Sequence, residues 1–173
     1  MNRTARKAYL ALGTNLGDRL ANLKRAPELL LAEPGLELEA CSNIYETEPV
    51  GGPDQGPFLN VCLSVKTDLS PVTLLLRMLA VEEKMKRVRE KRWGPRIIDL
   101  DLLIYEATIM NTPLLQLPHP RLAERDFVLI PLANIAPGLL VPGGNRTVQE
   151  ILDRRKENPG VKFYRPSDWC GTR

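Results

Sequence analysis

Residues 92–105 read RWGPRIIDLDLLIY, and they place two aspartates inside an otherwise apolar run. The run from 97 to 105 follows a Gly-Pro turn and predicts a β-strand, whose side chains point alternately to two faces. This alternation assigns one face to Ile98, Leu100, Leu102 and Ile104, and the other to Ile97, Asp99, Asp101, Leu103 and Tyr105. Both carboxylates then point the same way, with their Cα atoms about 6.6 Å apart at the usual strand rise.

The aspartate pair favours a metal site over a solvated sheet edge, which is the alternative interpretation. Apolar residues flank the two carboxylates on their own face, and unpaired charge in such surroundings is costly. Carboxylates without nearby histidine or cysteine ligands suit a hard cation such as Mg²⁺ better than zinc. We therefore predict that Asp99 and Asp101 bind Mg²⁺, holding one ion or bracketing two.

A basic segment precedes this strand. Residues 84–96, KMKRVREKRWGPR, contain seven cations against one acid, Glu90. Alone, such a segment is typical of an exposed loop, but beside two aspartates it favours a polyphosphate that carries Mg²⁺. No P-loop and no G-x-G-x-x-G pattern occurs in the sequence. His119, between two prolines, could hydrogen-bond a phosphate, or could equally be satisfied by a backbone carbonyl.

The wider pattern predicts an α+β fold of the ferredoxin-like type, an antiparallel sheet with helices on one face and the active site on the other. Strands are expected over residues 8–15, 36–47, 58–67 and 97–105. Helices are expected over 18–32, from the Ser70-Pro71 start to about residue 84, and over a shorter stretch from 126 to 135. Pro27 is expected to kink the first helix.

Composition places this pattern in one compact domain. The chain has 173 residues, 43% of them hydrophobic, and a formal net charge of +3. We expect a domain of residues 1–155 with a loose tail at 156–173. Three distant cysteines and a single histidine predict a reducing compartment, with no disulfide framework and no zinc site. We expect a cytoplasmic monomer that binds neither nucleic acid nor membrane.

Five segments carry a family resemblance. ALGTNLGDRLANL, YETEPVG, FLN, RVREKRWGPRIIDLDLLIY and LPHPRLAERDFVLIPLANIAP occur in this order between residues 8 and 153. Together they resemble the 6-hydroxymethyl-7,8-dihydropterin pyrophosphokinases of folate biosynthesis, and the RWGPRxIDLD element is the most specific of them. The resemblance implies a ferredoxin-like fold. It also implies transfer of the β,γ-pyrophosphoryl group of MgATP to the hydroxymethyl oxygen of the pterin, with release of AMP.

The resemblance also implies roles for individual residues. By position in the matching motifs, Asp99 and Asp101 are ligands of two Mg²⁺ ions. The residues of a loop that closes on the phosphates are Arg87, Arg89, Trp93 and Arg96. The residues that contact ATP are Glu82, Ile98, His119 and Arg125. The residues that hold the pterin are Phe58 and Phe127, which sandwich the ring, and Asn60, Thr47, Pro49 and Val50, which contact its edge.

Two positions depart from the family pattern: Lys86 stands where glycine is frequent, and Pro27 is unexpected in its helix.

Two other functions fit the same features. One is an RNA-binding module, because ferredoxin-like sheets also bind RNA through aromatics and basic loops. It is disfavoured because only 5% of the residues are aromatic. The other is a nucleotidyl or phosphoryl transferase that uses the same Mg²⁺ pair on a different acceptor.

Overall fold

The computed structural model describes residues 4–49, 54–85, 95–156 and 160–171. Within these residues, one antiparallel sheet has the strand order β5-β1-β4-β3-β8, and β2 also pairs with β4. Its strands are β1 (Arg6–Thr14), β2 (Leu36–Cys41), β3 (Ile44–Thr47), β4 (Phe58–Thr67), β5 (Asp99–Tyr105) and β8 (Val161–Arg165). With β2 and β3 taken as one strand, the order β5-β1-β4-β2/β3 is that of a ferredoxin-like sheet, and the fold prediction is confirmed.

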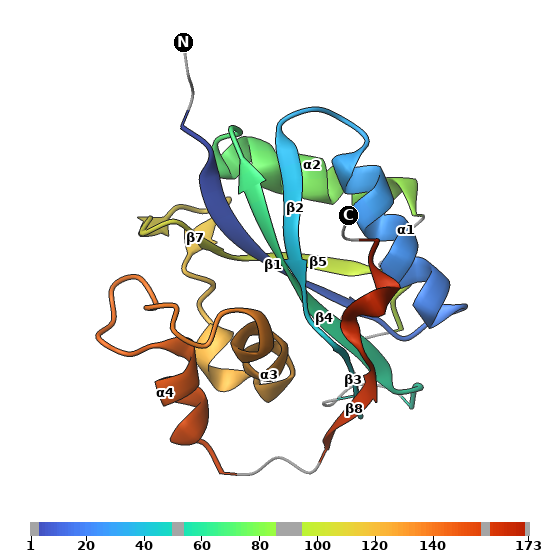
Figure 1. Ribbon diagram of the computed structural model, residues 1–173. Coiled ribbons are helices and arrows are strands. Elements are labelled where there is room, and N and C mark those ends of the chain that lie inside the picture. Colours follow the sequence, from blue (N-terminus) through green and yellow to red (C-terminus); the bar gives the residue numbers. More distant parts are fainter. Residues whose placement is uncertain (1–3, 50–53, 86–94, 157–159, 172–173) are drawn as a thin grey trace.

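Two helices cover one face of the sheet, α1 (Arg19–Leu31) and α2 (Pro71–Lys84) (Figure 1). Each begins at a predicted cap. Asp18 accepts the backbone N–H of Ala21 at 3.0 Å, and Ser70 accepts that of Thr73 at 3.1 Å. These caps satisfy donors that the first helical turn would otherwise leave without partners. The larger core cluster fills the space between the helices and the sheet.

The other face of the sheet carries the rest of the chain. The 3-10 helix η1 (Leu122–Glu124) leads into α3 (Asp126–Ile135), and α4 (Val148–Asp153) packs beside α3 (Figure 1). A second core cluster joins α3 to the sheet and includes Leu103 and Leu129. Two short strands, β6 (Met110–Asn111) and β7 (Gln116–Leu117), form a hairpin beyond β5. The site face is therefore partly covered, and only the remainder is open to a ligand.

Strand β5 contains a β-bulge against β1 that corrects the predicted alternation. Leu10 pairs with Leu102, but the adjacent Tyr9 pairs with Ile104, so Leu103 is the extra residue. One extra residue reverses the faces of the sheet to which the side chains after it point. Ile104 consequently lies on the site face beside Leu103, while Tyr105 turns to the opposite face. The face assignment was wrong for these two residues.

The predicted strand over 36–47 is divided into β2 and β3. The break falls at Ser42, whose hydroxyl donates to the carbonyl of Asn43 at 2.7 Å and accepts the backbone N–H of Cys62 at 2.9 Å. A side chain that hydrogen-bonds to nearby backbone groups competes with the regular backbone hydrogen bonds between strands, which explains the interruption.

The described part of the C-terminal segment is integrated into the fold. Strand β8 pairs with β3, and the following 3-10 helix η2 (Ser167–Trp169) buries Trp169, whose indole N–H donates to the carbonyl of Ser42 at 2.8 Å. Cys41 and Cys170 form a disulfide across 129 residues of sequence. The expectation of no disulfide was wrong, because folding brings together two cysteines whose spacing gave no signal. The division of the chain at residue 155 stays a prediction.

In the described ranges, no helix is both long enough and apolar enough to cross a membrane.

Candidate active site

A cavity of about 550 Å³ opens on the site face of the sheet. Residues of β1, β4 and β5 form one side of it, and residues of η1 and α3 form the other. Asp99 and Asp101 both line this cavity, as the alternation on the first half of β5 predicts. Their cross-strand neighbours on β1 are Gly13 and Ala11. These small residues leave the space above the sheet that a larger pair would fill.

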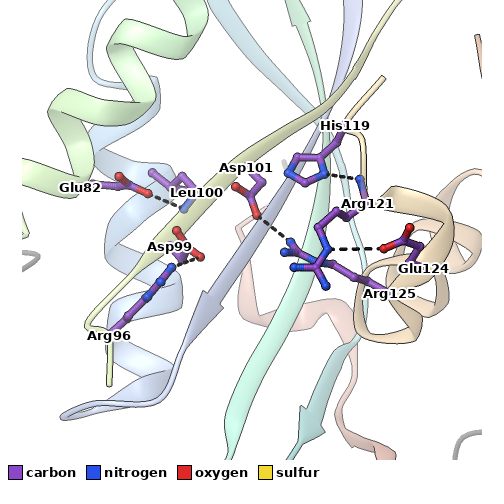
Figure 2. Close-up of polar contacts among 9 residues, drawn as sticks. All are labelled: Glu82, Arg96, Asp99, Leu100, Asp101, His119, Arg121, Glu124 and Arg125. Atoms are coloured by element: carbon purple, nitrogen blue, oxygen red, sulfur yellow. Dashed lines mark hydrogen bonds and ion pairs between the residues drawn. The ribbon is translucent and has the colours of Figure 1, made fainter. Parts of the chain in front are cut away.

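Each aspartate has an arginine close to it (Figure 2). Arg96 Nη1 lies 2.7 Å from Asp99 Oδ2, and Arg125 Nη1 lies 3.8 Å from Asp101 Oδ2. The two aspartate side chains are 27% and 33% exposed, so a ligand in the cavity can reach them. The binding of Mg²⁺ by these carboxylates stays a prediction, and each of them has a cationic side chain near it.

The donor set fits a magnesium ion that arrives with a nucleotide. Among the described residues, no group of three or more His, Cys, Asp and Glu side chains could hold a metal ion. Two carboxylates are hard oxygen donors, and Mg²⁺ commonly takes only one or two carboxylates and completes its six positions with waters and substrate phosphates. The arrangement therefore suits Mg²⁺ bound to a polyphosphate better than an ion held by the protein alone.

Asn15, from the ALGTN segment, fixes the backbone that carries Arg96. Its side-chain oxygen accepts the Arg96 N–H at 2.7 Å, and its backbone N–H donates to the Arg96 carbonyl at 3.0 Å. Its side-chain amide also donates to Gln55 and to the carbonyl of Gly56. One buried asparagine thus joins two loops at the rim of the cavity. Sequence reasoning missed this role because the hydrogen bonds to Arg96 span 81 residues.

Glu82 lies on α2 and is only 4% exposed. Its carboxylate accepts the backbone N–H of Leu100 at 2.8 Å (Figure 2). Leu100 stands between the two aspartates, and β5 is the terminal strand of the sheet, so this bond holds the edge that carries them. Ile98 is fully buried in the core beneath the sheet and does not line the cavity. Contacts of Glu82 and Ile98 with ATP stay predictions.

His119 lies beside the aspartates with its ring orientation set by the backbone (Figure 2). Its Nδ1 accepts the backbone N–H of Arg121 at 3.1 Å, and the backbone N–H of His119 donates to the carbonyl of Leu103 at 2.8 Å. Burial, reinforced by the charge of Arg125, lowers the pKa of His119 to about 4. The ring is therefore neutral at pH 7, and with Nδ1 as acceptor, Nε2 carries the proton and can donate it in a hydrogen bond.

Arg125 joins the two halves of the cavity. It stands between η1 and α3, with its guanidinium 5.6 Å from the centre of the Phe127 ring and near Asp101. Burial lowers the pKa of Arg125, but a guanidinium remains charged at neutral pH. Arg121 and Glu124 form an ion pair at 3.5 Å on the same wall. The sequence did not single out these last two residues.

Four other residues of the cavity lining suit a flat heterocycle. Phe58 on β4 and Phe127 on α3 both line the cavity, as does the buried pair Asn60 and Thr47. Asn60 Nδ2 donates to Thr47 Oγ1 at 2.8 Å, which fixes the orientation of the amide. A Cβ at Gly13 would lie 3.3 Å from Asn60 Oδ1, so a glycine at this position avoids a tight contact with the Asn60 amide. Pro49 does not line the cavity, and its role stays a prediction.

A second cavity, of about 420 Å³, shares Asp101 with the first. Its lining includes Leu75 on α2, Leu102 on β5 and the segment 112–116 between β6 and β7, with His119 at one side. Sequence reasoning missed segment 112–116, because it carries no motif and lies beside the aspartates only in the folded chain. Two cavities that meet at a carboxylate can hold two substrates with their reacting ends together.

Four of the predicted site residues lie outside the described residues: Val50, Arg87, Arg89 and Trp93. Their roles stay predictions.

Comparison with known proteins identifies close relatives. The family described as 7,8-dihydro-6-hydroxymethylpterin-pyrophosphokinase (HPPK) matches residues 9–137. The chain is 48% identical over 146 residues to the 2-amino-4-hydroxy-6-hydroxymethyldihydropteridine pyrophosphokinase of Methylorubrum extorquens, covering 84% of this chain and 91% of the relative. It is 47% identical over 158 residues to the Bacillus subtilis protein of the same name, covering 91% of this chain and 90% of that one.

Solved structures support the fold. Wild-type Plasmodium falciparum HPPK-DHPS superposes with a TM-score of 0.70 at 16% identity, covering 87% of this chain. The chain spans 44% of the length of that protein. At this identity the likeness concerns the fold alone.

Proposed function

The chain belongs to the 7,8-dihydro-6-hydroxymethylpterin-pyrophosphokinase family, and we propose that it performs the family's reaction where the two cavities meet. In this reaction the β,γ-pyrophosphoryl group of MgATP moves to the hydroxymethyl oxygen of 6-hydroxymethyl-7,8-dihydropterin, and AMP is released. The single observation that carries the assignment of the site is the position of Asp101, which lines both cavities with Asp99 and two arginines beside it.

The pterin occupies the first cavity. A pterin is flat and has hydrogen-bond donors and acceptors on its rim, so it suits aromatic faces and an amide of fixed orientation. Phe58 and Phe127 supply the aromatic faces, and Asn60, held by Thr47, supplies the amide. The hydroxymethyl group then points toward the aspartates. Val50 and Pro49 complete the edge contacts in this proposal.

ATP occupies the second cavity with its phosphates toward Asp101. The leucine and proline side chains of its lining provide a surface for the base, and His119 at the boundary can donate from Nε2 to a phosphate oxygen. Arg125 and Arg96 neutralise further phosphate oxygens from the two sides of the aspartate pair. In this proposal Arg87 and Arg89 add positive charge, and Trp93 closes on the phosphates with them.

The transfer needs little covalent chemistry from the protein. The acceptor oxygen must be aligned with the β-phosphorus, and the negative charge on the migrating group must be neutralised. Asp99 and Asp101 would hold two Mg²⁺ ions, which supply charge neutralisation on the phosphate oxygens when bound. Arg125 Nη1 lies 3.8 Å from Asp101 Oδ2, which places its charge near the migrating group.

We also infer a cytoplasmic monomer that binds neither nucleic acid nor membrane, in keeping with ATP as a substrate and with the small net charge. This location would place the Cys41–Cys170 bond in a compartment where most thiols stay reduced. The RNA-binding alternative is weakened because α3 covers part of the sheet face that such modules use.

The test is product analysis. Purified protein is incubated with ATP, Mg²⁺ and 6-hydroxymethyl-7,8-dihydropterin, and AMP and ADP are quantified with and without pterin. We expect AMP in a one-to-one ratio with consumed pterin, and none after the metal is chelated. ADP as the pterin-dependent product would indicate phosphoryl transfer instead. A folded protein that forms neither product would contradict the assignment.

A further inference from the structure

Arg155 follows α4 and lies beyond the residues matched by the family, yet it lines the first cavity. We propose that Arg155 is a positioning residue that holds segment 123–127, and with it Arg125 and Phe127, in place for the reaction. The proposal deepens the proposed function and rests on it. Sequence reasoning placed Arg155 at the very end of the domain and gave it no role.

The guanidinium of Arg155 contacts three acceptors in four consecutive residues. Its Nε donates to Asp126 Oδ1, its Nη1 to the carbonyl of Ala123 at 3.0 Å, and its Nη2 to the carbonyl of Glu124 at 3.1 Å. The Asp126 side chain is only 9% exposed. A planar guanidinium that donates to three acceptors fixes both the position and the orientation of the segment that carries them, which a single point charge cannot do.

The segment held in this way is a junction with little regular support. Arg125 has an extended backbone, with φ −114° and ψ 102°, between η1 and α3, and its side chain, at the N-cap of α3, makes no capping hydrogen bond. The two carbonyls that Arg155 binds belong to the end of η1, and Asp126 is the first residue of α3. Arg155 therefore ties together the two elements on either side of Arg125.

This junction carries two groups of the proposed site. Arg125 reaches toward Asp101, and Phe127 lies against the guanidinium of Arg125. Any shift of the junction moves the cation and the aromatic ring together. A displacement of about 1 Å in a positioning group can cost roughly a hundredfold in rate. Loss of Arg155 should consequently change catalysis without any contact between Arg155 and the reacting atoms.

Arg155 itself extends from a well-anchored helix. A capping box formed by Thr147 and Glu150 starts α4. The backbone N–H of Val148 donates to the carbonyl of Leu139 at 2.8 Å, which joins α4 to the loop after α3. The N–H of Arg155 donates to the carbonyl of Leu152 at 3.0 Å in the turn that follows α4. The position of α4 is thereby transmitted to the junction through one side chain.

The test compares Arg155→Ala and Arg155→Lys with Arg154→Ala, a matched control in which the neighbouring, exposed arginine is removed. For each variant kcat and the KM for pterin and for ATP are measured from AMP formation, and melting is followed in parallel. We expect Arg155→Ala to lower kcat/KM for the pterin by roughly ten- to a hundredfold. Arg154→Ala should stay within about twofold of wild type, as surface substitutions usually do.

Arg155→Lys should recover only part of the loss, because an ammonium can pair with Asp126 but cannot bind three acceptors in the fork arrangement. Hydrogen exchange of the amides in 122–130 gives a readout that does not need activity. We expect faster exchange there in Arg155→Ala, with α1 and α2 unchanged. If wild type forms no AMP, the proposed function fails, while the exchange data still test the contact.

The proposal is overturned if Arg155→Ala folds and matches Arg154→Ala in both kcat/KM and exchange. If Arg155→Ala does not fold, Arg155→Lys decides the question. Wild-type kcat/KM in that variant would show that the three-acceptor arrangement is not needed.

Discussion

Replacing Asp101 by asparagine should separate catalysis from stability. The substitution keeps the shape of the side chain and removes its charge. In the structure Asp101 is 33% exposed, and Arg125 Nη1 lies 3.8 Å from its carboxylate. Such a partly exposed pair contributes about 0–1 kcal/mol to folding. Removing the charge also relieves its repulsion with Asp99, on the order of 1 kcal/mol for two carboxylates about 7 Å apart.

These two effects oppose each other, so the free energy of unfolding of Asp101→Asn should stay within about 1 kcal/mol of wild type. For a chain of this size, 1 kcal/mol corresponds to a change in Tm of about 2–4 °C. The loss in activity should be far larger. A charged metal ligand stabilises the transition state by several kcal/mol, and about 4 kcal/mol corresponds to a thousandfold in rate.

The assay is pterin-dependent AMP formation at saturating ATP, titrated with Mg²⁺, together with thermal unfolding of the same samples. Asp99→Asn should behave in the same way, and Asp168→Asn, an exposed aspartate on η2, is the control. Near-normal turnover in a folded Asp101→Asn protein would refute the metal assignment. A drop in Tm of more than about 10 °C would instead refute the separation of catalysis from stability.

Three further predictions follow from the site and the core. His119 is the only histidine, and its pKa of about 4 lies below the value near 6.5 in the unfolded chain. Its contribution to stability is therefore present above pH 6.5 and is lost as the pH falls toward 4. In NMR spectra of tag-free protein, the Cε1 proton of His119 should not titrate between pH 5.5 and 8. Glu82→Ala should leave the buried N–H of Leu100 without this acceptor and lower the free energy of unfolding by about 1–3 kcal/mol, whereas Glu83→Ala, on the exposed side of α2, should have almost no effect in the same urea titration. Cys170→Ser should lower the free energy of unfolding, measured without reductant, by about 2–4 kcal/mol, and adding reductant to wild type should lower it by a similar amount.

Local sequence patterns predicted much of the fold. Alternating residues predicted β5 and the shared face of Asp99 and Asp101, while Asp18 and Ser70 marked the starts of α1 and α2. These features depend on residues within one or two turns of each other, so the spacing of side chains along the chain is enough to reveal them.

The tertiary structure decided what depends on distant partners. The bulge that turns Tyr105 away from the site arises from pairing with β1, and the bond between Cys41 and Cys170 joins segments 129 residues apart. The second cavity forms only when segment 112–116 folds beside β5.

Arg155 gains its place beside Asp126 in the same way, through the packing of α4 against α3. No local pattern encodes such contacts, because each depends on how the whole chain packs. The sequence by itself thus determined which residues could carry charge and form strands and helices. The folded chain determined which of them meet.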